Sequence, residues 1–470
     1  MLKTVLCIFN LVMKFECNDG GHLPCFGAYD IRGKVPSQLN EELVNRLAKA
    51  FASQFKPRSI VIGRDVRPSS QNLAYALSDG FVDMGVDVID IGPCGTEMLY
   101  FAVGSLNVGG GIMVTASHNP SDYNGLKLVR EHAIPISGDS GLFELERGII
   151  VGDFPLKKTP QGTVKNINIM PKYIDHLLSF VKGKELKPFH IVTNAGNGNA
   201  GPVLDALEPR VPFELIKLNC NLDGTFPNGV PNPLLPENRT ATVNCMRSNS
   251  CDFGVAWDGD FDRCFFFDEE TNFIEGYYIV GLLAREMLEA HPGSKIILDP
   301  RLTWNTIEQV QSLGGIPVIS KTGHAFIKER MRKENAVYGG EMSAHHYFRD
   351  FYYCDTGMVP LLLISAILAS AKKTLGQLVS GMMNAHPCSG EINFQVTDPP
   401  AIIKRVEEKY KTHAKAVDYI DGLSMEFTEW RFNLRMSNTE PLIRLNVETR
   451  GDRELLSQKT KELQYLIQNR

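Results

Sequence analysis

Residues 59–65 of the chain read Ser-Ile-Val-Ile-Gly-Arg-Asp, an apolar run of strand length that ends in a charged turn. The same order recurs at 190–198 (His-Ile-Val-Thr-Asn-Ala-Gly-Asn-Gly) and at 295–301 (Lys-Ile-Ile-Leu-Asp-Pro-Arg), each followed by an apolar-periodic segment. A buried strand, a polar or glycine-containing turn and then a helix form one βα unit of an α/β layer. The three copies therefore predict three similar α/β domains in tandem.

Helix signals accompany the first of these strands. Asn40 stands at an N-cap position before the apolar-periodic stretch 44–51. Ser70 precedes a second such stretch, and Gly85 follows it as a helix stop. We therefore expect one helix after Asn40 and another after Ser70, the second leading into a strand at 86–89.

The C-terminal part of the chain has a different pattern. Residues 430–435 and 442–448 are predicted strands, and in the second of them Ile443, Leu445 and Val447 alternate with polar residues. A strand with one apolar face is typical of an antiparallel sheet that is backed by helices. This region is therefore predicted to form a smaller α+β domain.

The expected fold class is α/β, with three similar α/β domains in tandem and a C-terminal α+β domain. A length of 470 residues agrees with three or four domains, since domains run to roughly 100–200 residues. The boundaries we expect are an N-terminal extension (1–21), domain I (22–160), domain II (161–272), domain III (273–386) and domain IV (387–470).

Composition narrows the class of protein. Apolar residues make up 43% and charged residues 22%, the balance of a globular protein able to bury several cores. The formal net charge of −5 argues against nucleic acid as a general partner, because nucleic-acid binding leaves a basic footprint. The ten cysteines form no CxxC pair and no zinc spacing, a pattern that suits reduced thiols and a cytoplasmic location.

The N-terminus has a faint likeness to a targeting segment. Residues 4–13 are mostly apolar, but this stretch is too short to span a bilayer. Charged residues follow it at once from Lys14, without the small-residue site at which a signal peptide is cleaved. We expect an extension outside the fold, or a start codon placed too early, and no membrane association.

Ser117 lies in the first segment that points to chemistry. Residues 109–120 read Gly-Gly-Gly-Ile-Met-Val-Thr-Ala-Ser-His-Asn-Pro, an apolar strand that ends in small polar side chains. A serine presented on a loop at a strand end is well placed for function. The segment is not the GxSxG elbow of hydrolases, because Ala116 and His118 flank the serine. On this segment alone, a plain turn rich in Asn and Pro remains the alternative.

Three aspartates form the second segment. Asp258, Asp260 and Asp262 alternate along a loop between the apolar runs 253–257 and 264–267. Carboxylates together with a phosphate oxygen make a hard-oxygen site that suits Mg²⁺. An EF-hand is the competing metal site, but its sixth loop position is an arginine here, where the calcium loop requires glycine. The loop is therefore predicted to hold Mg²⁺.

Two further segments contain the types of residue that are found in ligand-binding loops. Glu341 follows a glycine pair within 339–346, where short polar side chains are suited to sugar hydroxyls; a plain loop is the alternative. The other segment combines a guanidinium with hydroxyl and amide groups, which is suited to phosphate; a solvated hairpin tip is the alternative. Its residues are Arg435, Ser437, Asn438, Thr439 and the nearby Arg444.

Taken in order, one per domain, these four segments resemble the α-D-phosphohexomutase superfamily, and within it the bacterial phosphomannomutases. The resemblance begins at 26–33, Phe-Gly-Ala-Tyr-Asp-Ile-Arg-Gly, and runs to near the C-terminus. It implies four domains around a central cleft. The chain departs from the family pattern at Gly27, where relatives usually carry a larger residue, and at Arg301, where some carry lysine.

The resemblance also implies roles for individual residues. Ser117 matches the phosphorylated serine, whose oxygen joins three aspartates in binding Mg²⁺: Asp258, Asp260 and Asp262. Lys127 is expected to stabilise charge and transfer a proton, with Arg32 and His118 orienting the phosphoserine. The residues expected to bind substrate are Tyr29, Arg263, His324, Glu341, Ser343, His345, Arg435, Ser437, Asn438 and Thr439.

The expected activity is interconversion of mannose 6-phosphate and mannose 1-phosphate through a phosphoserine enzyme and a hexose 1,6-bisphosphate, which also serves as activator. The product is expected to feed GDP-mannose and surface polysaccharide synthesis. The partner is a small sugar phosphate, and the chain is expected to be a monomer or dimer. The alternatives are a phosphoglucomutase, a dual-specificity enzyme, or a non-catalytic protein that binds sugar phosphates.

Overall fold

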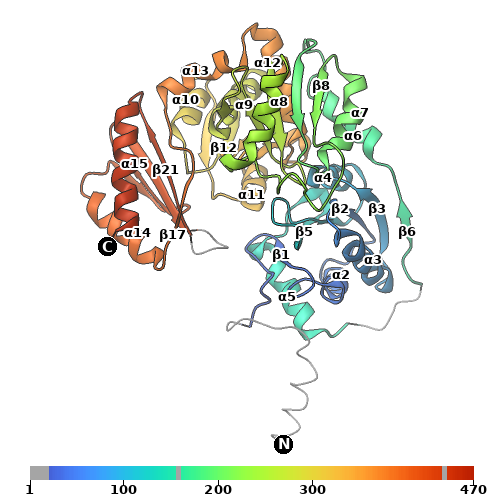
Figure 1. Cartoon of the computed structure of the whole chain (residues 1–470). Helices are drawn as coiled ribbons and strands as arrows, with labels where there is room; N and C mark the ends of the chain where they lie inside the picture. The colour runs from blue at the N-terminus through green and yellow to red at the C-terminus, as the bar shows by residue number, and fades with distance from the viewer. Residues whose placement is uncertain (1–20, 155–159, 437–441, 470) are drawn as a thin grey trace, which may run out of the picture. The chain divides into compact units, whose positions relative to one another are not determined.

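The computed structural model describes residues 21–154, 160–436 and 442–469 (Figure 1). The chain divides into two compact units. The N-terminal unit consists of Met1–Lys182, Val192–Thr242 and Ala256–Asp262. The C-terminal unit consists of Gly183–Ile191, Val243–Val255 and Arg263–Arg470. Each unit is described by itself below.

The first sheet has the strand order β1-β5-β4-β2-β3-β6. Strands β2, β3, β4 and β6 are parallel, whereas β5 pairs antiparallel with both β4 and β1. The loop that carries Ser117 therefore joins a parallel strand to an antiparallel one. The strand bounds in sheet order are Ile31–Lys34, Tyr123–Arg130, Gly110–Val114, Ser59–Arg64, Asp87–Pro93 and Val164–Asn166.

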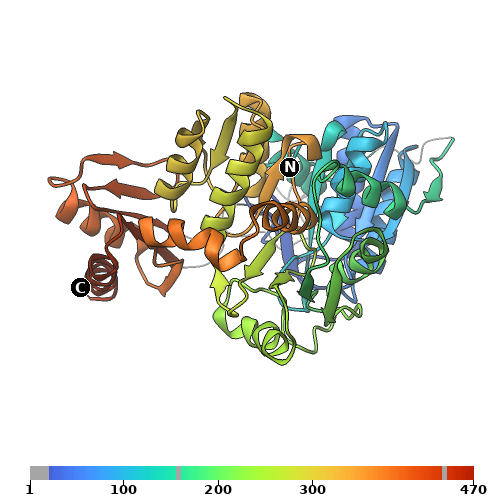
Figure 2. The same ribbon diagram turned by 90° about the horizontal axis from the view of Figure 1, so that it is seen from above.

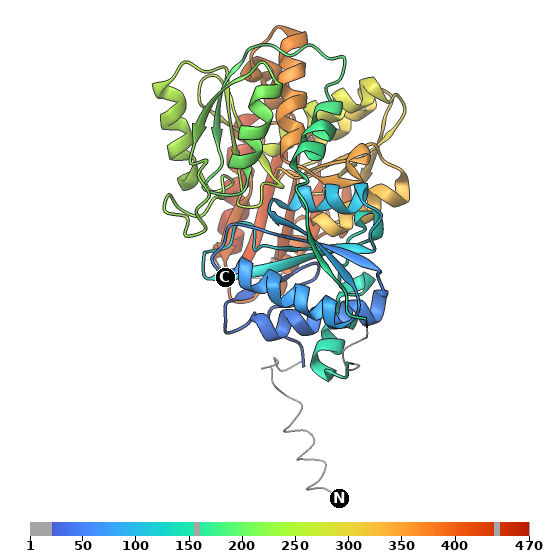
Figure 3. The same ribbon diagram turned by 90° about the vertical axis from the view of Figure 1, so that its right-hand side faces the viewer.

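Helices α2 (Glu41–Phe55) and α3 (Ser70–Asp83) lie side by side against this sheet (Figure 3). Their apolar faces share one core with α5 (Leu142–Val151) and with alternate residues of the strands. Asn40 caps α2 as predicted, accepting a hydrogen bond from the Leu43 amide at 3.0 Å. Helix α4 (Thr96–Ser105) packs on strands β2 and β4.

The second sheet has the order β11-β10-β9-β7-β8. The aspartate loop joins β9 to β10. The helices that accompany this second sheet are α6 (Met170–Ser179), α7 (Ala200–Leu207) and α8 (Thr240–Ser248). The strand bounds in sheet order are Phe273–Ile274, Cys264–Phe267, Phe253–Trp257, His190–Asn194 and Glu214–Leu218.

The third sheet, in the C-terminal unit, has the order β13-β12-β14-β15-β16. Strands β13, β12 and β14 are parallel, and β15 and β16 continue the sheet antiparallel. The strand bounds in sheet order are Ile316–Ile319, Lys295–Leu298, Tyr338–Gly340, His346–Phe348 and Cys354–Asp355. Its helices are α9 (Gly276–Ala290), α10 (Trp304–Ser312), α11 (His324–Glu334), α12 (Met358–Ala371) and α13 (Leu375–Ala385).

No single helix in the part of the chain that the structure describes is long and apolar enough to cross a membrane. Helices α12 and α13 meet the length and composition test only as a pair bent by 95°. Most of α12 is buried inside the protein, which explains its hydrophobicity as that of a core helix.

The fourth sheet is antiparallel, with the order β17-β21-β20-β19-β18. Helices α14 (Pro399–Tyr410) and α15 (Arg453–Gln468) pack side by side on one face (Figure 1), and Figure 2 views α15 nearly along its axis. The predicted α+β domain is confirmed. The strand bounds in sheet order are Ile392–Gln395, Leu442–Thr449, Trp430–Met436, Leu423–Glu426 and Ala416–Asp418.

Two polar residues of β21, Asn446 and Glu448, are buried as well as its apolar face. Glu448 is fully buried and pairs with Arg431 at 2.8 Å while accepting a hydrogen bond from the Thr303 amide at 2.7 Å. Arg431 in turn donates to the carbonyl of Arg301 at 3.1 Å. The fourth sheet is therefore joined to the segment after β12 by charged and polar contacts within the C-terminal unit.

Short 3₁₀ turns occupy Glu131–Ala133, Gly138–Ser140, Glu208–Arg210, Pro236–Arg239 and Arg349–Phe351.

Candidate active site

Ser117 lies in the connection between β4 and β5 and is 2% exposed. Its φ of +51° is left-handed, a conformation that costs energy for serine and must be held by neighbouring contacts. The backbone amide donates to the Thr115 hydroxyl at 2.9 Å. The side-chain hydroxyl donates to Asp258 Oδ2 at 2.8 Å and lies 2.9 Å from His118 Nδ1. The hydroxyl is thus fixed against the aspartate loop.

Arg67 holds this serine loop through hydrogen bonds to its backbone, a role that was not predicted from the sequence. The guanidinium is 2% exposed and donates to the backbone carbonyls of Ser117 at 2.9 Å and Asn119 at 2.6 Å. It pairs through Nε with Asp65 at 3.1 Å. Two more carbonyls accept from it, those of Pro120 and Tyr123. Because β2 and β4 are parallel neighbours, the residues after both strands meet at one sheet edge, and this was the available clue.

Asp258, Asp260 and Asp262 are at most 1% exposed, and their ligand oxygens lie within 4.8 Å of one another. The loop packs closely on the serine loop. A Cβ on Gly259 would stand 2.6 Å from the Ser117 carbonyl oxygen, so only glycine permits this approach. The structure thus brings the three carboxylates together.

Lys127, on β5, reaches the same cluster. Its Nζ lies 2.7 Å from Asp260 Oδ2 and 2.5 Å from Asp262 Oδ2, and the Thr96 hydroxyl also donates to Asp260. One lysine leaves three buried carboxylates with an excess of negative charge. Asp260 Oδ1 is buried and has no hydrogen-bond partner among the residues that the structure describes. Carboxylate oxygens with residual charge and an unused buried acceptor fit a divalent cation such as Mg²⁺.

Arg32 contacts the serine loop from β1. Its Nη1 donates to Asn119 Oδ1 at 2.9 Å, and its Nε donates to Asp30 Oδ2 at 2.9 Å. Burial acts to lower the pKa of the guanidinium, but Asp30 and the other acidic groups around it, Tyr29 among them, raise it overall. A permanent positive charge is therefore held beside the loop of Ser117.

In the C-terminal unit, Glu341 is 1% exposed and both its carboxylate oxygens are engaged. Oε1 accepts from the Gly323 amide at 2.9 Å, and Oε2 accepts from the Tyr347 hydroxyl at 2.5 Å. Each oxygen keeps a second lone pair, so the side chain is oriented and still able to accept from a ligand. The neighbouring Ser343 hydroxyl accepts from Arg301 Nη2 at 3.2 Å.

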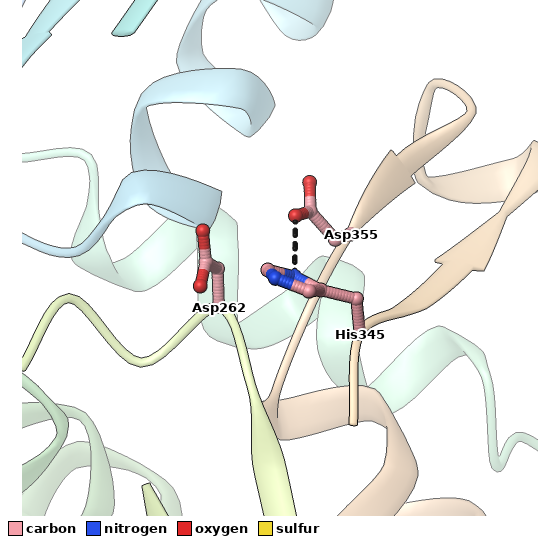
Figure 4. Close-up of side chains that lie close together, drawn as sticks. All are labelled: Asp262, His345 and Asp355. Carbon is pink, nitrogen blue, oxygen red and sulfur yellow. Dashed lines mark ion pairs between the residues drawn. The ribbon is translucent and has the colours of Figure 1, made fainter. Parts of the chain in front are cut away.

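His345 follows the same loop, and its Nδ1 lies 3.0 Å from Asp355 Oδ2 (Figure 4). Asp355 is fully buried and also lies 2.6 Å from Lys328 Nζ, so one carboxylate contacts both the lysine and the histidine. His324 begins α11, with its Nδ1 3.4 Å from the same lysine nitrogen. Sequence reasoning did not single out Asp355 or Lys328, because nothing in their local pattern marks a buried ion pair.

Arg263 and Arg435 are the remaining predicted site residues of this unit. Arg263 forms a backbone bridge with His345, and its guanidinium lies 5.6 Å from the centre of the Phe265 ring. Arg435, at the end of β20, is 7% exposed, with its Nη2 3.3 Å from Glu391 Oε2. Three predicted phosphate-binding residues lie outside the described residues: Ser437, Asn438 and Thr439.

The predicted residues fall into two sets, one in each unit. The N-terminal unit brings together the serine, the aspartates and their cationic neighbours: Tyr29, Arg32, Ser117, His118, Lys127, Asp258, Asp260 and Asp262. The C-terminal unit carries Arg263, His324, Glu341, Ser343, His345 and Arg435. The first set has the components of a metal-assisted phosphoryl acceptor, and the second has cations and acceptors suited to a sugar phosphate.

Known proteins resemble this chain over nearly its whole length. A phosphomannomutase of Escherichia coli strain K12 is 56% identical over 451 residues, covering 95% of this chain and 99% of the relative. Phosphohexose mutases of Xanthomonas campestris are 55% identical over 445 residues, with the same coverage. A crystal structure of a phosphoglucomutase/phosphomannomutase family protein from Burkholderia thailandensis matches with a TM-score of 0.85 and 32% identity, covering 95% of this chain and 97% of that one.

Four family models match in succession along the chain. They are the phosphoglucomutase/phosphomannomutase α/β/α domains I, II and III at residues 24–149, 171–272 and 275–386, and the C-terminal domain at 391–463. The four-domain architecture expected from the sequence is therefore present in full. The chain belongs to the phosphoglucomutase/phosphomannomutase family of phosphohexomutase enzymes.

Proposed function

We propose that the protein is a phosphomannomutase that moves a phosphoryl group between O6 and O1 of mannose through phosphorylated Ser117. The observation that carries the proposal is the buried hydroxyl of Ser117, which donates to Asp258 at 2.8 Å beside the other two aspartates and Lys127. High identity to relatives named phosphomannomutase supports mannose as the sugar.

In the proposed step, phospho-Ser117 gives its phosphoryl group to the free hydroxyl of the sugar phosphate. The bond between phosphorus and Ser117 Oγ breaks, and a bond between phosphorus and the sugar oxygen forms. The proton of the sugar hydroxyl is transferred to Ser117 Oγ. The regenerated Ser117 hydroxyl is stabilised by its hydrogen bond to Asp258. The resulting hexose 1,6-bisphosphate turns and returns its other phosphoryl group to the serine.

We assign Asp258, Asp260 and Asp262 as the protein ligands of Mg²⁺, which would supply charge neutralisation at the phosphoryl oxygens. A phosphoserine carries close to two negative charges, so cationic groups beside it matter. Lys127 already lies between two of these carboxylates, and we propose that it balances charge there. Proton transfer by Lys127 remains part of the proposal. Arg32 and His118 would orient the phosphoserine.

In the other unit, Glu341 and Ser343 are proposed to bind sugar hydroxyls, with Arg263, His324 and His345 contacting the substrate. Tyr29 of the N-terminal unit is proposed to contribute likewise. Arg435 would hold the phosphate that does not react, together with Ser437, Asn438 and Thr439. A hexose 1,6-bisphosphate would act as activator. We further propose that the product feeds GDP-mannose synthesis, and the cysteine pattern supports a cytoplasmic location.

A dual-specificity or glucose-preferring phosphohexomutase is the second candidate. Mannose and glucose differ only at the C2 hydroxyl, and the relatives from Xanthomonas campestris carry the broader name phosphohexose mutases. A non-catalytic sugar-phosphate binder is the weaker alternative, because Ser117 and all three aspartates are retained and converge.

The test is turnover of mannose 1-phosphate and glucose 1-phosphate by purified protein with Mg²⁺ and the matching bisphosphate. We expect a much higher kcat/KM for mannose 1-phosphate, and loss of activity in Ser117→Ala. Ser121→Ala, at an exposed serine of the same loop, is the matched control and should behave like the wild type. Equal or better turnover of glucose 1-phosphate would exclude the mannose assignment. Absence of both activities and of a phosphoryl adduct on Ser117 by intact mass would exclude catalysis.

A further inference from the structure

Glu391 lies among three arginines of the C-terminal unit. Its Oε2 is 3.4 Å from Arg301 Nη1 and 3.3 Å from Arg435 Nη2, so one oxygen is shared by the two guanidiniums. Its Oε1 lies 3.7 Å from Arg444 Nη1. The Glu391 side chain is 6% exposed, which makes it a buried anion at the meeting point of these three cations.

The three arginines are not equally compensated. Arg301 has its own partner in Asp299, which accepts from it at 2.9 Å and 3.0 Å. Arg435 and Arg444 depend mainly on Glu391, since among the described residues the other carboxylate within ion-pair distance of either is Asp421, 4.0 Å from Arg435. Within the ranges that the structure describes, the buried Nε atoms of Arg435 and Arg444 have no hydrogen-bond partner. This pair therefore keeps donor capacity and positive charge for a further anion.

Glu391 is ionised in this setting. Burial alone would raise the pKa of the carboxyl, but Arg301, Arg444 and Arg435 outweigh burial, and the pKa lies below its ordinary value. The side chain thus presents a full negative charge to the two guanidiniums at any pH at which the enzyme would work. An external phosphate and Glu391 must share the same donors, and the two anions repel each other.

We propose that Glu391 is a positioning residue that acts as a built-in competitor for substrate phosphate at Arg435 and Arg444. It keeps both guanidiniums in place when no phosphate is bound, and its charge limits how tightly phosphate is held. This inference rests on the proposed function, because a mutase must release the non-reacting phosphate, turn the bisphosphate and bind it again. A phosphate site without the competitor would retain the intermediate in one orientation.

Glu391 also connects this phosphate site to the sugar-binding loop. Arg301, which shares Oε2 of Glu391 with Arg435, donates to the Ser343 hydroxyl at 3.2 Å and lies 3.6 Å from Glu341. A change in how Arg435 pairs with Glu391 therefore alters the charge that faces Arg301. The carboxylate is well placed to adjust both loops to the arrival or departure of a phosphate.

The decisive variant is Glu391→Gln, which keeps the shape of the side chain and removes its charge. Calorimetric titration with inorganic phosphate should show affinity increased on the order of tenfold, because one repelling charge is gone. With mannose 1-phosphate as substrate, KM should fall and kcat should fall with it, since release and turning of the intermediate become slower. A purely structural role predicts the opposite, weaker phosphate binding and a raised KM.

Two companion variants keep the test decisive. Glu391→Asp retains the charge and should bind inorganic phosphate within about twofold of the wild type. Glu408→Gln, at an exposed glutamate of α14, makes the same chemical change away from the cluster and should leave phosphate binding unaltered. Tighter binding in Glu391→Gln should also disappear when Arg444→Gln is added, which localises the bound phosphate.

Phosphate binding as tight as the wild type or weaker in Glu391→Gln would overturn the proposal, as would equal gains in Glu391→Asp. If Glu391→Gln unfolds, Glu391→Asp alone decides: a phosphate affinity reduced beyond about twofold means a structural role. The titration requires no turnover. Failure of mannose 1-phosphate to react would therefore remove the proposed function and leave the phosphate result standing by itself.

Discussion

Arg67→Lys tests whether the planar guanidinium of one buried arginine fixes the conformation of the serine loop. Arg67 donates to four backbone carbonyls of the segment 117–123 and pairs with Asp65. Lysine keeps the positive charge but offers its three donors from a single nitrogen, so it cannot reproduce this spread of contacts. The substitution therefore separates the geometry of the guanidinium from its charge.

The magnitude follows from the contacts. If lysine retains Asp65 and two of the four carbonyls, two hydrogen bonds from a charged donor are lost. At about 1.5–3 kcal/mol each, their loss lowers the free energy of unfolding by about 3–6 kcal/mol. Burial lowers the pKa of Arg67 and raises that of Asp65, so neither member of this pair tolerates being left alone. Lysine avoids that larger penalty.

The assay is urea unfolding together with steady-state turnover of mannose 1-phosphate. Because Ser117 is held in a left-handed conformation by its surroundings, a relaxed loop should displace its hydroxyl and lower kcat by about tenfold or more. Arg147→Lys, at an exposed arginine, is the matched control and should change stability by less than about 0.5 kcal/mol. An Arg67→Lys enzyme with unchanged stability and kcat would refute the reasoning.

Three further predictions concern stabilisation by Mg²⁺, loss of stability at low pH, and the buried ion pair of Glu448 with Arg431. Mg²⁺ at about a hundred times its dissociation constant should stabilise the wild type by about 2.7 kcal/mol in thermal unfolding, and Asp260→Asn should lose most of this gain. Burial lowers the pKa of His346 to about 3, so the unfolded chain takes up a proton below about pH 6.5 that the native protein does not. Stability should therefore fall by about 1.4 kcal/mol per pH unit from pH 6.5 toward pH 3 through this group, a slope that His346→Gln removes in pH-dependent urea titrations. Glu448→Gln leaves Arg431 buried without its partner and should cost about 3 kcal/mol or more in urea unfolding, part of which Arg431→Met should restore in the double variant.

Local pattern was enough to predict one strand in each of the three α/β domains. The apolar run predicted from Ser59 forms β2, and those at His190 and Lys295 form β7 and β12. Each is short, apolar and bounded by polar turns, so its conformation depends on its own residues and on burial. The same holds for the N-cap at Asn40, where the side chain and the amide that it accepts from are three residues apart.

Pairing between strands and side chains that are distant in the chain could not be predicted from the sequence. Nothing local tells that β5 returns antiparallel beside β4, and this pairing is what brings Lys127 to the aspartates. The alternating face of β21 was also read correctly, but its polar members Asn446 and Glu448 are buried against partners distant in the chain. Arg67 escaped notice for the same reason, because its four acceptors lie about fifty residues away in a different loop.

The charges at the candidate site follow one physical requirement. A ligand that carries phosphate needs cations, but in the proposed mechanism the bisphosphate must also turn, so strong uncompensated cations would be a disadvantage. Lys127 is accordingly paired with two aspartates, Arg32 with Asp30, and Arg435 with Glu391. An arriving phosphate must therefore compete with a carboxylate at each cation, and the net attraction stays moderate. On this proposal the net charge of −5 is compatible with phosphate binding, because binding would depend on exchange of partners within buried ion pairs.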